Sequence, residues 1–363
     1  MPVTRIEADA ALARLDSFSA IVDARSESEF ALDRLPGAVN WPTLTDAERA
    51  SVGTEYAQVS AFEARKHGAV LAARNIARHV EREAGGLGKD WQPLVYCWRG
   101  GQRSGALSTV LGQVGWRVHM LEGGYQAFRR AVLVALEALP AQFSFRTVCG
   151  PTGSGKSRLL RALAAEGAQV LDLEALANHR GSVLGHEPDS AQPTQKAFDT
   201  SLWDALRRFD AGEPVWVESE SRKIGDVRLG DALLAAIRAA PCVWLEVPIE
   251  ARVEGLLRDY RHLVDDTPRF CDRLDALVSL RGREVVGGWQ SLAREGRHAE
   301  VVRALLDEHY DPIYRRSLDR NFGAAPRTVL AWNGAEETLG AIARAARSPE
   351  IRSTTPGCPA TPA

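Results

Sequence analysis

The sequence lacks a hydrophobic run long enough to cross a membrane. A membrane-spanning helix needs about 18 or more consecutive apolar residues, and no stretch of this 363-residue chain approaches that length. The first residues, Met1-Pro2-Val3-Thr4-Arg5, also lack the apolar core of a signal peptide. These absences exclude a helical membrane protein, and we expect a cytoplasmic location.

Cysteines are few and lie far apart. The five are Cys97, Cys149, Cys242, Cys271 and Cys358, with no Cys-x-x-Cys pair and no Cys/His cluster at zinc spacing. Disulfide frameworks and structural zinc sites both have closely spaced cysteines. We therefore expect five reduced thiols and no structural metal.

An excess of positive charge is also absent. The formal net charge is -2, so nucleic acid would have to be bound by a local basic face rather than by the whole surface. With 45% hydrophobic and 25% charged residues, the composition is that of a globular protein. At roughly 150 residues per domain, the length predicts two domains.

The most informative stretch of the first half is a cysteine loop. An apolar run, residues 94–96, predicts a buried strand that delivers Cys97 onto a glycine-containing loop, and a helical pattern follows from about Ser104. Backbone N–H groups, the helix N-terminus and two arginines would favour the thiolate over the thiol. An ordinary buried cysteine at a strand end needs neither the glycine pair nor the arginines. We assign Cys97 and Arg103 as catalytic residues. The other residues of the loop, predicted to bind the molecule that Cys97 attacks, are Trp98, Arg99, Gly100, Gly101, Gln102 and Ser104.

Strands and helices alternate around this loop. Apolar runs at residues 20–23, 38–42 and 117–121 predict further strands, and Ser26 followed by Glu29 predicts a capped helix start. This alternation indicates a small parallel α/β domain.

These residues resemble the rhodanese family of sulfur-carrying domains over roughly residues 5 to 135. The resemblance is carried by Asp23-x-Arg25-x3-Glu29-Phe30, Pro36-Gly37-Ala38-x-Asn40-x-Pro42, the Cys97 loop and Glu122-Gly123-Gly124. Arg34 stands where many members have histidine. The loop from Cys97 to Arg103 is Cys-x5-Arg, one residue longer than usual, which is the length found in cysteine-dependent phosphatases. A phosphatase therefore stays an alternative, and the longer loop would also suit a phosphate-bearing or selenium donor.

The second half begins with a phosphate-binding loop. Residues 143–149 predict a strand that runs into a complete G-x4-G-K-S motif, followed by a helical pattern that stops at Gly167. Loop N–H groups and the helix N-terminus can hold phosphates, Lys156 can neutralise the distal one, and Ser157 could hold Mg²⁺, the only metal site we consider. The residues predicted to bind a diphosphate are Gly150, Thr152, Gly153, Ser154, Gly155, Lys156 and Ser157.

The sequence does not identify a nucleotide as the ligand of this loop. No lysine follows an asparagine, so the base-reading motif of GTPases is absent. The strand at residues 215–217 ends in Glu218 rather than in the aspartate that usually serves Mg²⁺ in ATPases. A diphosphate that is not a nucleotide fits these absences as well as ATP does.

Charged residues follow two strands of the second half. These charged residues follow the strand at 169–171 and the strand that ends at Glu218. They therefore lie at the carboxyl edge of a parallel sheet, where open α/β sheets bind ligands. A solvated turn is the alternative for both groups. The residues assigned to this second site are Asp172, His179, Arg180, Glu218, Glu220 and Arg222. Strands at 243–248 and 328–332 complete a predicted five-stranded sheet.

A helical stretch at about 250–320 is rich in arginine, with Tyr260, Phe270 and Trp289 among the arginines. Such a surface suits single-stranded RNA, although acidic residues are mixed in and a solvated helical face fits equally well. The Pro/Thr-rich end is expected to be disordered. We therefore predict a rhodanese-like parallel α/β domain at 1–138, a P-loop α/β domain with a helical segment at 139–347, and a tail at 348–363.

The combination of the two domains resembles the bacterial tRNA 2-selenouridine synthase family, to about residue 335. Beyond the two loops, the resemblance is carried by Gly123-Gly124-Tyr125-x-Ala127-x-Arg129, Asp172-Leu173-Glu174-x-Leu176-Ala177-x-His179-Arg180-Gly181-Ser182, Glu218-x-Glu220-Ser221-Arg222-x-Ile224-Gly225 and Tyr310-Asp311-Pro312-x-Tyr314. It implies action on 5-substituted 2-thiouridine at the wobble position of tRNA. The sulfur is first geranylated from geranyl diphosphate, and S-geranyl is then replaced by selenium from selenophosphate.

On this resemblance, we hypothesise that Cys97 takes selenium as a perselenide and that the loop with Lys156 binds the diphosphate. We expect no tightly bound cofactor and a monomer. The alternatives are a cysteine phosphatase or generic sulfurtransferase fused to a kinase-like domain, and an RNA-binding module built from inactive folds. Binding alone would not need a nucleophile such as Cys97.

Overall fold

The computed structural model describes residues 3–180, 191–323 and 325–348, and these form two compact units. The first unit runs to Leu136 and includes the separate segment Pro193–Asp204; the second begins at Glu137 and contains the rest. The boundary expected at residues 138 and 139 lies close to this division. The inclusion of Pro193–Asp204 in the first unit is not foreseeable from sequence order. The expected tail, except for Ser348, lies outside the described residues.

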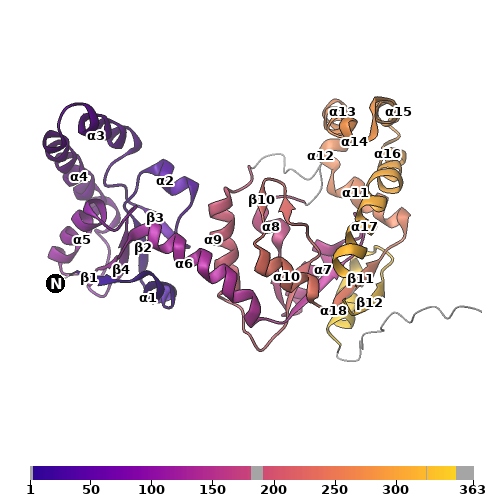
Figure 1. Ribbon diagram of the computed structural model, residues 1–363, viewed down its shortest axis with the longest axis horizontal. Coiled ribbons are helices and arrows are strands. Elements are labelled where there is room, and N and C mark those ends of the chain that lie inside the picture. Colours follow the sequence, from indigo (N-terminus) through magenta and orange to yellow (C-terminus); the bar gives the residue numbers. More distant parts are fainter. Residues whose placement is uncertain (1–2, 181–190, 324, 349–363) are drawn as a thin grey trace, which may run out of the picture. The chain divides into compact units, whose positions relative to one another are not determined.

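The first unit is built on a five-stranded parallel sheet of strand order β1-β5-β4-β2-β3 (Figure 1). The strands are β1 (Thr4–Ile6), β2 (Ala20–Asp23), β3 (Ala38–Asn40), β4 (Pro93–Tyr96) and β5 (His119–Leu121). The helices are α1 (Ala8–Leu12), η1 (Leu15–Ser17), α2 (Glu27–Leu32), α3 (Asp46–Gln58), α4 (Ala61–Glu83), α5 (Gln102–Val114) and α6 (Gly124–Ala138). The predicted parallel α/β domain is confirmed.

Local sequence signals explain how this unit positions its loop. Strand β4 is buried along its whole length, because a parallel strand between two neighbours is covered on both faces. Ser26 and Glu29 form the predicted capping box at the start of α2. Leu107 and Leu111 of α5 are fully buried against the β4 side of the core, which fixes the helix that follows the cysteine loop.

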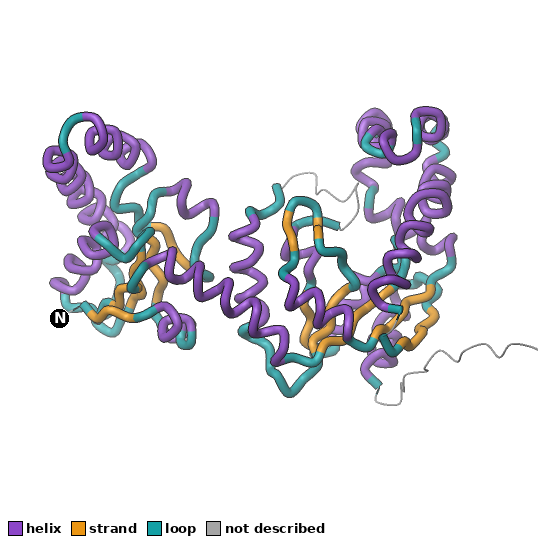
Figure 2. The backbone as a smooth tube through the Cα atoms, viewed as in Figure 1, coloured by secondary structure: helices purple, strands orange, loops and turns teal. Residues whose placement is uncertain are grey.

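The second unit contains the predicted five-stranded sheet, whose strands are among those drawn in orange in Figure 2. The sheet is parallel and has the order β12-β11-β6-β8-β7. Its strands are β6 (Phe145–Cys149), β7 (Gln169–Leu171), β8 (Val215–Glu218), β11 (Cys242–Glu246) and β12 (Arg327–Ala331), beside a hairpin of β9 (Lys223–Ile224) and β10 (Val227–Arg228). The helices of this unit outside the helical segment are η2 (Leu139–Gln142), α7 (Lys156–Ala165), α8 (Leu173–Ala177), α10 (Asp231–Ala239), η4 (Glu336–Thr338) and α18 (Leu339–Arg347), whereas α9 (Gln195–Leu206) belongs to the first unit up to Asp204. Because β6 is the central strand, the loop after it lies at the middle of the carboxyl edge.

The predicted helical segment is a set of short helices with an apolar core of its own. They are α11 (Ile249–Asp259), α12 (Arg261–Val264), α13 (Thr267–Asp275), α14 (Val278–Arg281), α15 (Arg283–Arg294), α16 (His298–Ala304), the π-helix η3 (Leu305–Tyr310) and α17 (Asp311–Phe322). Phe270 and Trp289 are buried in this core, so they cannot stack on RNA bases, and that expectation was wrong for both. Arg252 is also buried, against Asp311.

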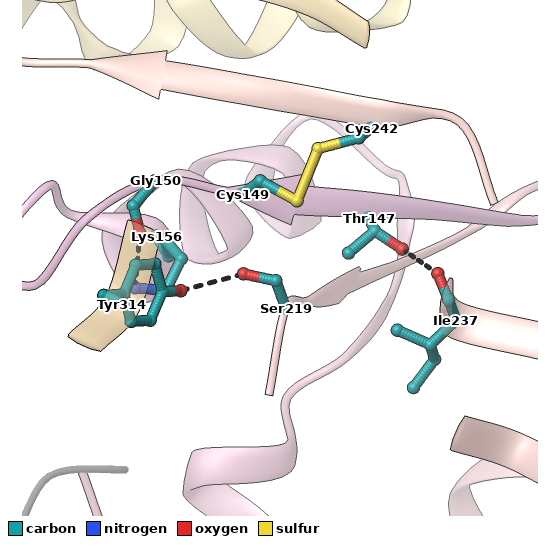
Figure 3. Close-up of a disulfide and its surroundings, with 8 residues drawn as sticks. All are labelled: Thr147, Cys149, Gly150, Lys156, Ser219, Ile237, Cys242 and Tyr314. Atoms are coloured by element: carbon teal, nitrogen blue, oxygen red, sulfur yellow. Dashed lines mark hydrogen bonds between the residues drawn. A yellow bond between two sulfur atoms is a disulfide. The ribbon is translucent and has the colours of Figure 1, made fainter. Parts of the chain in front are cut away.

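The expectation of five reduced thiols was wrong. Cys149 and Cys242 form a disulfide with Cα atoms 6.2 Å apart (Figure 3). They are 93 residues apart in sequence but lie on the adjacent parallel strands β6 and β11. Cys97 and Cys271 are free thiols, and Cys358 lies outside the described residues.

No helix in the described ranges combines the length and apolarity that crossing a membrane would require.

Candidate active site

The Cys97 sulfur sits at the carboxyl end of β4 and receives two hydrogen bonds. The Gly101 N–H donates to Sγ at 3.3 Å, and the Ser104 hydroxyl donates at 3.1 Å. Helix α5 begins at Gln102, so its N-terminus lies next to the sulfur. Both donors and the N-terminus of the helix therefore lie around the sulfur. Cys97 is buried, with only 3% of its surface exposed.

Two glycines allow the cysteine loop to pack against the turn before α6. Gly100 has φ +63°, and a Cβ there would come within 2.5 Å of the Leu121 carbonyl oxygen. Gly124 has φ +56°, and a Cβ there would collide with the Cys97 carbonyl oxygen. The Tyr125 N–H donates to that same carbonyl at 2.8 Å. The predicted role of glycine in this loop is thus explained by close backbone approach as well as by curvature.

Arg103 is held by the carboxylate of Glu29, which the sequence analysis assigned to a helix cap and to the rhodanese motif but not to the site. Its Nη1 lies 2.6 Å from Oε2 of Glu29. Burial opposes ionisation of Glu29, but the hydrogen bond and charge of Arg103 outweigh it and keep the pKa of Glu29 below its ordinary value. Arg99 donates to Gln126. No direct contact joins either arginine to Sγ among the described residues, so their contact with a donor molecule stays a prediction.

Trp98 and the α6 turn are supported by a buried network. The Trp98 ring stacks on Tyr125 with centroids 5.3 Å apart, and the Tyr125 hydroxyl donates to Asp33 at 2.7 Å. Asp33 also accepts from Thr200 of α9, within the same unit. Asp33 and Thr200 could not be identified from local sequence patterns, because their contact joins segments 167 residues apart in the chain.

The phosphate-binding loop of the second unit has the predicted form. Lys156 Nζ donates to the Gly150 carbonyl at 3.1 Å and lies over the Tyr314 ring (Figure 3). Burial opposes its charge, but Tyr314 and nearby carboxylates raise the pKa of Lys156 above its ordinary value. Gly155 at φ +82° precedes α7, and a Cβ there would come within 2.5 Å of the Trp332 ring. Only glycine fits at position 155, and it lets the backbone of the loop come close to a bound phosphate.

Arg252 anchors the phosphate-binding loop through a backbone carbonyl. Its Nε donates to the Thr152 carbonyl at 2.9 Å, while its other nitrogens bind Asp311 at 2.6 and 2.9 Å. Arg252 belongs to the arginine-rich helical stretch, but it is buried against the loop and does not lie on a surface that could face RNA.

Carboxylates gather beside Ser157. The Ser157 hydroxyl donates to Glu174 at 2.6 Å, and the Glu174 N–H donates to Glu218 at 2.8 Å. Glu218 is fully buried, and its other oxygen has no hydrogen-bond partner among the described residues. Burial and neighbouring carboxylates raise the pKa of Glu218 well above its ordinary value and that of Glu220 to about 7. Glu174 was missed as a site residue, although it stands within the conspicuous Asp172-Leu173-Glu174 motif.

The remaining second-site residues divide into two groups. Asp172, His179, Arg180 and Glu220 line the same cavity of about 890 Å³ as the phosphate-binding loop. Arg222 instead pairs with Asp231 and is not part of the cavity lining, so it is not brought to the site. Gly181 and Ser182 of the same motif lie outside the described residues.

Known proteins match both units. Residues 7–131 match the rhodanese-like domain, and residues 143–277 match the tRNA 2-selenouridine synthase AAA domain. The curated tRNA 2-selenouridine synthase of Marinobacter nauticus is 32% identical, covering 86% of this chain and 93% of the relative. That of Hahella chejuensis is 34% identical, covering 83% and 86%. The crystal structure of a rhodanese-related protein from Thermoplasma volcanium is similar over 35% of this chain and 92% of its own, with 17% identity and a TM-score of 0.24. From the two domain matches and these relatives, the chain belongs to the tRNA 2-selenouridine synthase family.

Proposed function

We propose that this chain converts 5-substituted 2-thiouridine at wobble position 34 of tRNA to 2-selenouridine in two steps. The first attaches a geranyl group from geranyl diphosphate to sulfur, and the second replaces S-geranyl by selenium from selenophosphate. The observation that carries the proposal is the presence, in one member of this family, of a hydrogen-bonded Cys97 sulfur and a phosphate-binding loop with Lys156 in place.

In the geranylation step, the thiocarbonyl sulfur attacks C1 of geranyl diphosphate, the C–O bond breaks and diphosphate leaves. The base loses its N3 proton to solvent, so the S-geranyl product is neutral. Lys156 and the N–H groups of the loop stabilise the charge that develops on the leaving group. Ser157, Glu174 and the unpartnered Glu218 oxygen are oxygen donors of the kind Mg²⁺ prefers, so they fit that ion. Mg²⁺ would add charge neutralisation on the diphosphate.

In the selenation step, selenium attacks C2 of the base and geranylthiolate leaves. The Cys97 thiolate cleaves the Se–P bond of selenophosphate, and it can attack either of the two bonded atoms. Attack on selenium gives the perselenide, but the Se–P electron pair then stays on phosphorus and phosphite is formed. A further thiol is then needed to release the selenium. Attack on phosphorus gives phosphocysteine and selenide, water then yields phosphate, and no oxidant or reductant is required.

Of the two routes, we favour attack on phosphorus. The Cys-x5-Arg-Ser spacing matches a loop that surrounds a phosphate, and the Ser104 hydroxyl is placed to stabilise Cys97 thiolate when phosphocysteine breaks down. Phosphorus NMR after selenation distinguishes the routes, because phosphate supports attack on phosphorus and phosphite supports the perselenide.

The test of the whole proposal is mass spectrometry of tRNA nucleosides after addition of geranyl diphosphate and then selenophosphate. A geranyl mass gain followed by exchange to selenium is expected. An unchanged nucleoside mass at both steps contradicts the proposal. Hydrolysis of an aryl phosphate by Cys97, without any nucleoside change, would support the phosphatase alternative instead.

A further inference from the structure

A second, smaller cavity lies beside the phosphate-binding loop. It shares Thr152, Leu256, Tyr260 and Tyr310 with the lining of the large cavity, so the two spaces adjoin at the loop itself. The large cavity contains Lys156 and Ser157. A ligand whose diphosphate lies on the loop can therefore extend into the smaller cavity.

The walls of the smaller cavity are apolar. Besides Leu256 they include Phe270 of α13, Val302 of α16, and Leu305 and Leu306 of η3, which follows α16 in the chain (α13 and α16 are labelled in Figure 1). The volume open to the centre of a water molecule is about 50 Å³. To hold one ordered water, a cavity needs at least about 10–15 Å³ of volume measured in the same way, and two or more polar partners for that water. The space is wide enough for a few waters, but its walls hold them poorly.

The wall formed by η3 is a π-helix, an arrangement that is rare and is found frequently at functional sites. Leu305 and Leu306 of this helix line the small cavity, and Tyr310 lines both cavities. A well-packed core seldom leaves voids larger than a water molecule. A void beside a ligand loop, walled by a distorted helix, is better explained as a binding site than as loose packing.

The lining also distinguishes between two kinds of diphosphate. A nucleobase has donors and acceptors on its edges that lose their water partners on burial, which costs free energy when they stay unpaired. A hydrocarbon chain has no such groups. We infer that this cavity, formed by Leu256, Phe270, Val302, Leu305 and Leu306, binds the isoprenoid chain of the diphosphate substrate. The inference rests on the proposed function, because that function supplies an isoprenoid diphosphate.

Chain-length preference tests the assignment. Val302→Phe narrows the cavity, and its preference should shift from the ten-carbon geranyl toward the five-carbon dimethylallyl diphosphate by about 10- to 200-fold in kcat/KM. Leu306→Ala enlarges the cavity, and its preference should shift toward the fifteen-carbon farnesyl diphosphate. Val285→Phe is the matched control, because Val285 lies on α15, is half-exposed and is outside both linings. It should keep the wild-type preference.

Binding of inorganic diphosphate, measured by calorimetry, shows whether each variant retains a folded phosphate-binding loop. Unchanged diphosphate binding with shifted chain-length preference supports the inference. If the wild type transfers geranyl and both cavity variants keep its preference, the cavity assignment is wrong while the proposed function stands. If the wild type binds a geranyl thiodiphosphate analogue no tighter than inorganic diphosphate, the assignment fails independently of catalysis.

Discussion

Replacing Arg252 by methionine should destabilise the second unit and weaken its phosphate site. Arg252 is 5% exposed and binds Asp311 through two nitrogens at 2.6 and 2.9 Å. Removing one partner of a buried ion pair costs about 3–5 kcal/mol, because the remaining charge is left buried and unpaired. The lost hydrogen bond to Thr152 would add about 1 kcal/mol.

A double variant separates the two effects. In Arg252→Met/Asp311→Leu the buried charge is gone, and such apolar replacements are often neutral or even stabilising by about 1–4 kcal/mol. Stability should therefore return, but the Thr152 carbonyl still lacks its donor. We expect the affinity for inorganic diphosphate to stay reduced by roughly tenfold.

Urea unfolding followed by hydrogen exchange of peptides from residues 145–171 measures the stability of the second unit, and calorimetry measures diphosphate binding. Asp311→Asn, which keeps the Arg252 donor to Thr152, is the matched control for the loop. Two results would refute the reasoning. One is a single variant as stable as the wild type, and the other is a double variant that binds diphosphate as the wild type does.

Further predictions concern the two sites and the disulfide. Cys97→Ala should abolish selenation and spare geranylation, whereas Lys156→Ala should slow geranylation by roughly 100-fold or more; equal loss of both steps in either variant, measured on tRNA nucleosides, contradicts this division. The pKa of Glu220 is raised to about 7, so its contribution to stability is present below about pH 4.5 and is lost as the pH rises toward 7. The free energy of unfolding of Glu220→Gln should therefore fall less over that range than that of the wild type, and parallel pH profiles would contradict this. Without reductant, alkylation of the unfolded chain should leave Cys149 and Cys242 unlabelled; labelling of both would show that they are thiols.

Much of the fold could be predicted because its signals are local. The apolar strand runs, the Ser26 capping signal and the glycine pattern after Cys149 each depend on neighbouring residues, and the structure confirms them. The strand order of the second sheet was not deduced, because it depends on which strands pair. The disulfide was missed for the same reason, since only the pairing of β6 with β11 brings its cysteines together.

The candidate sites could be predicted only in part. Cys97, Lys156 and Ser157 belong to motifs whose spacing alone places them. Arg222 was wrongly included, because a charged residue four positions after a strand can turn toward a different helix, as it does toward Asp231. A short amphipathic helix turns its aromatic side chains toward the core. The prediction that Phe270 lies at a surface was wrong for this reason.

The carboxylate of Glu29 has a practical consequence for mutagenesis. One oxygen accepts from the Ser26 backbone at the start of α2 and also from Arg103. An alanine there would fray a helix and release an arginine together, so a loss of activity would not reveal which event caused it. Glutamine can still accept at the helix start but carries no charge, so Glu29→Gln is the substitution that isolates the electrostatic role.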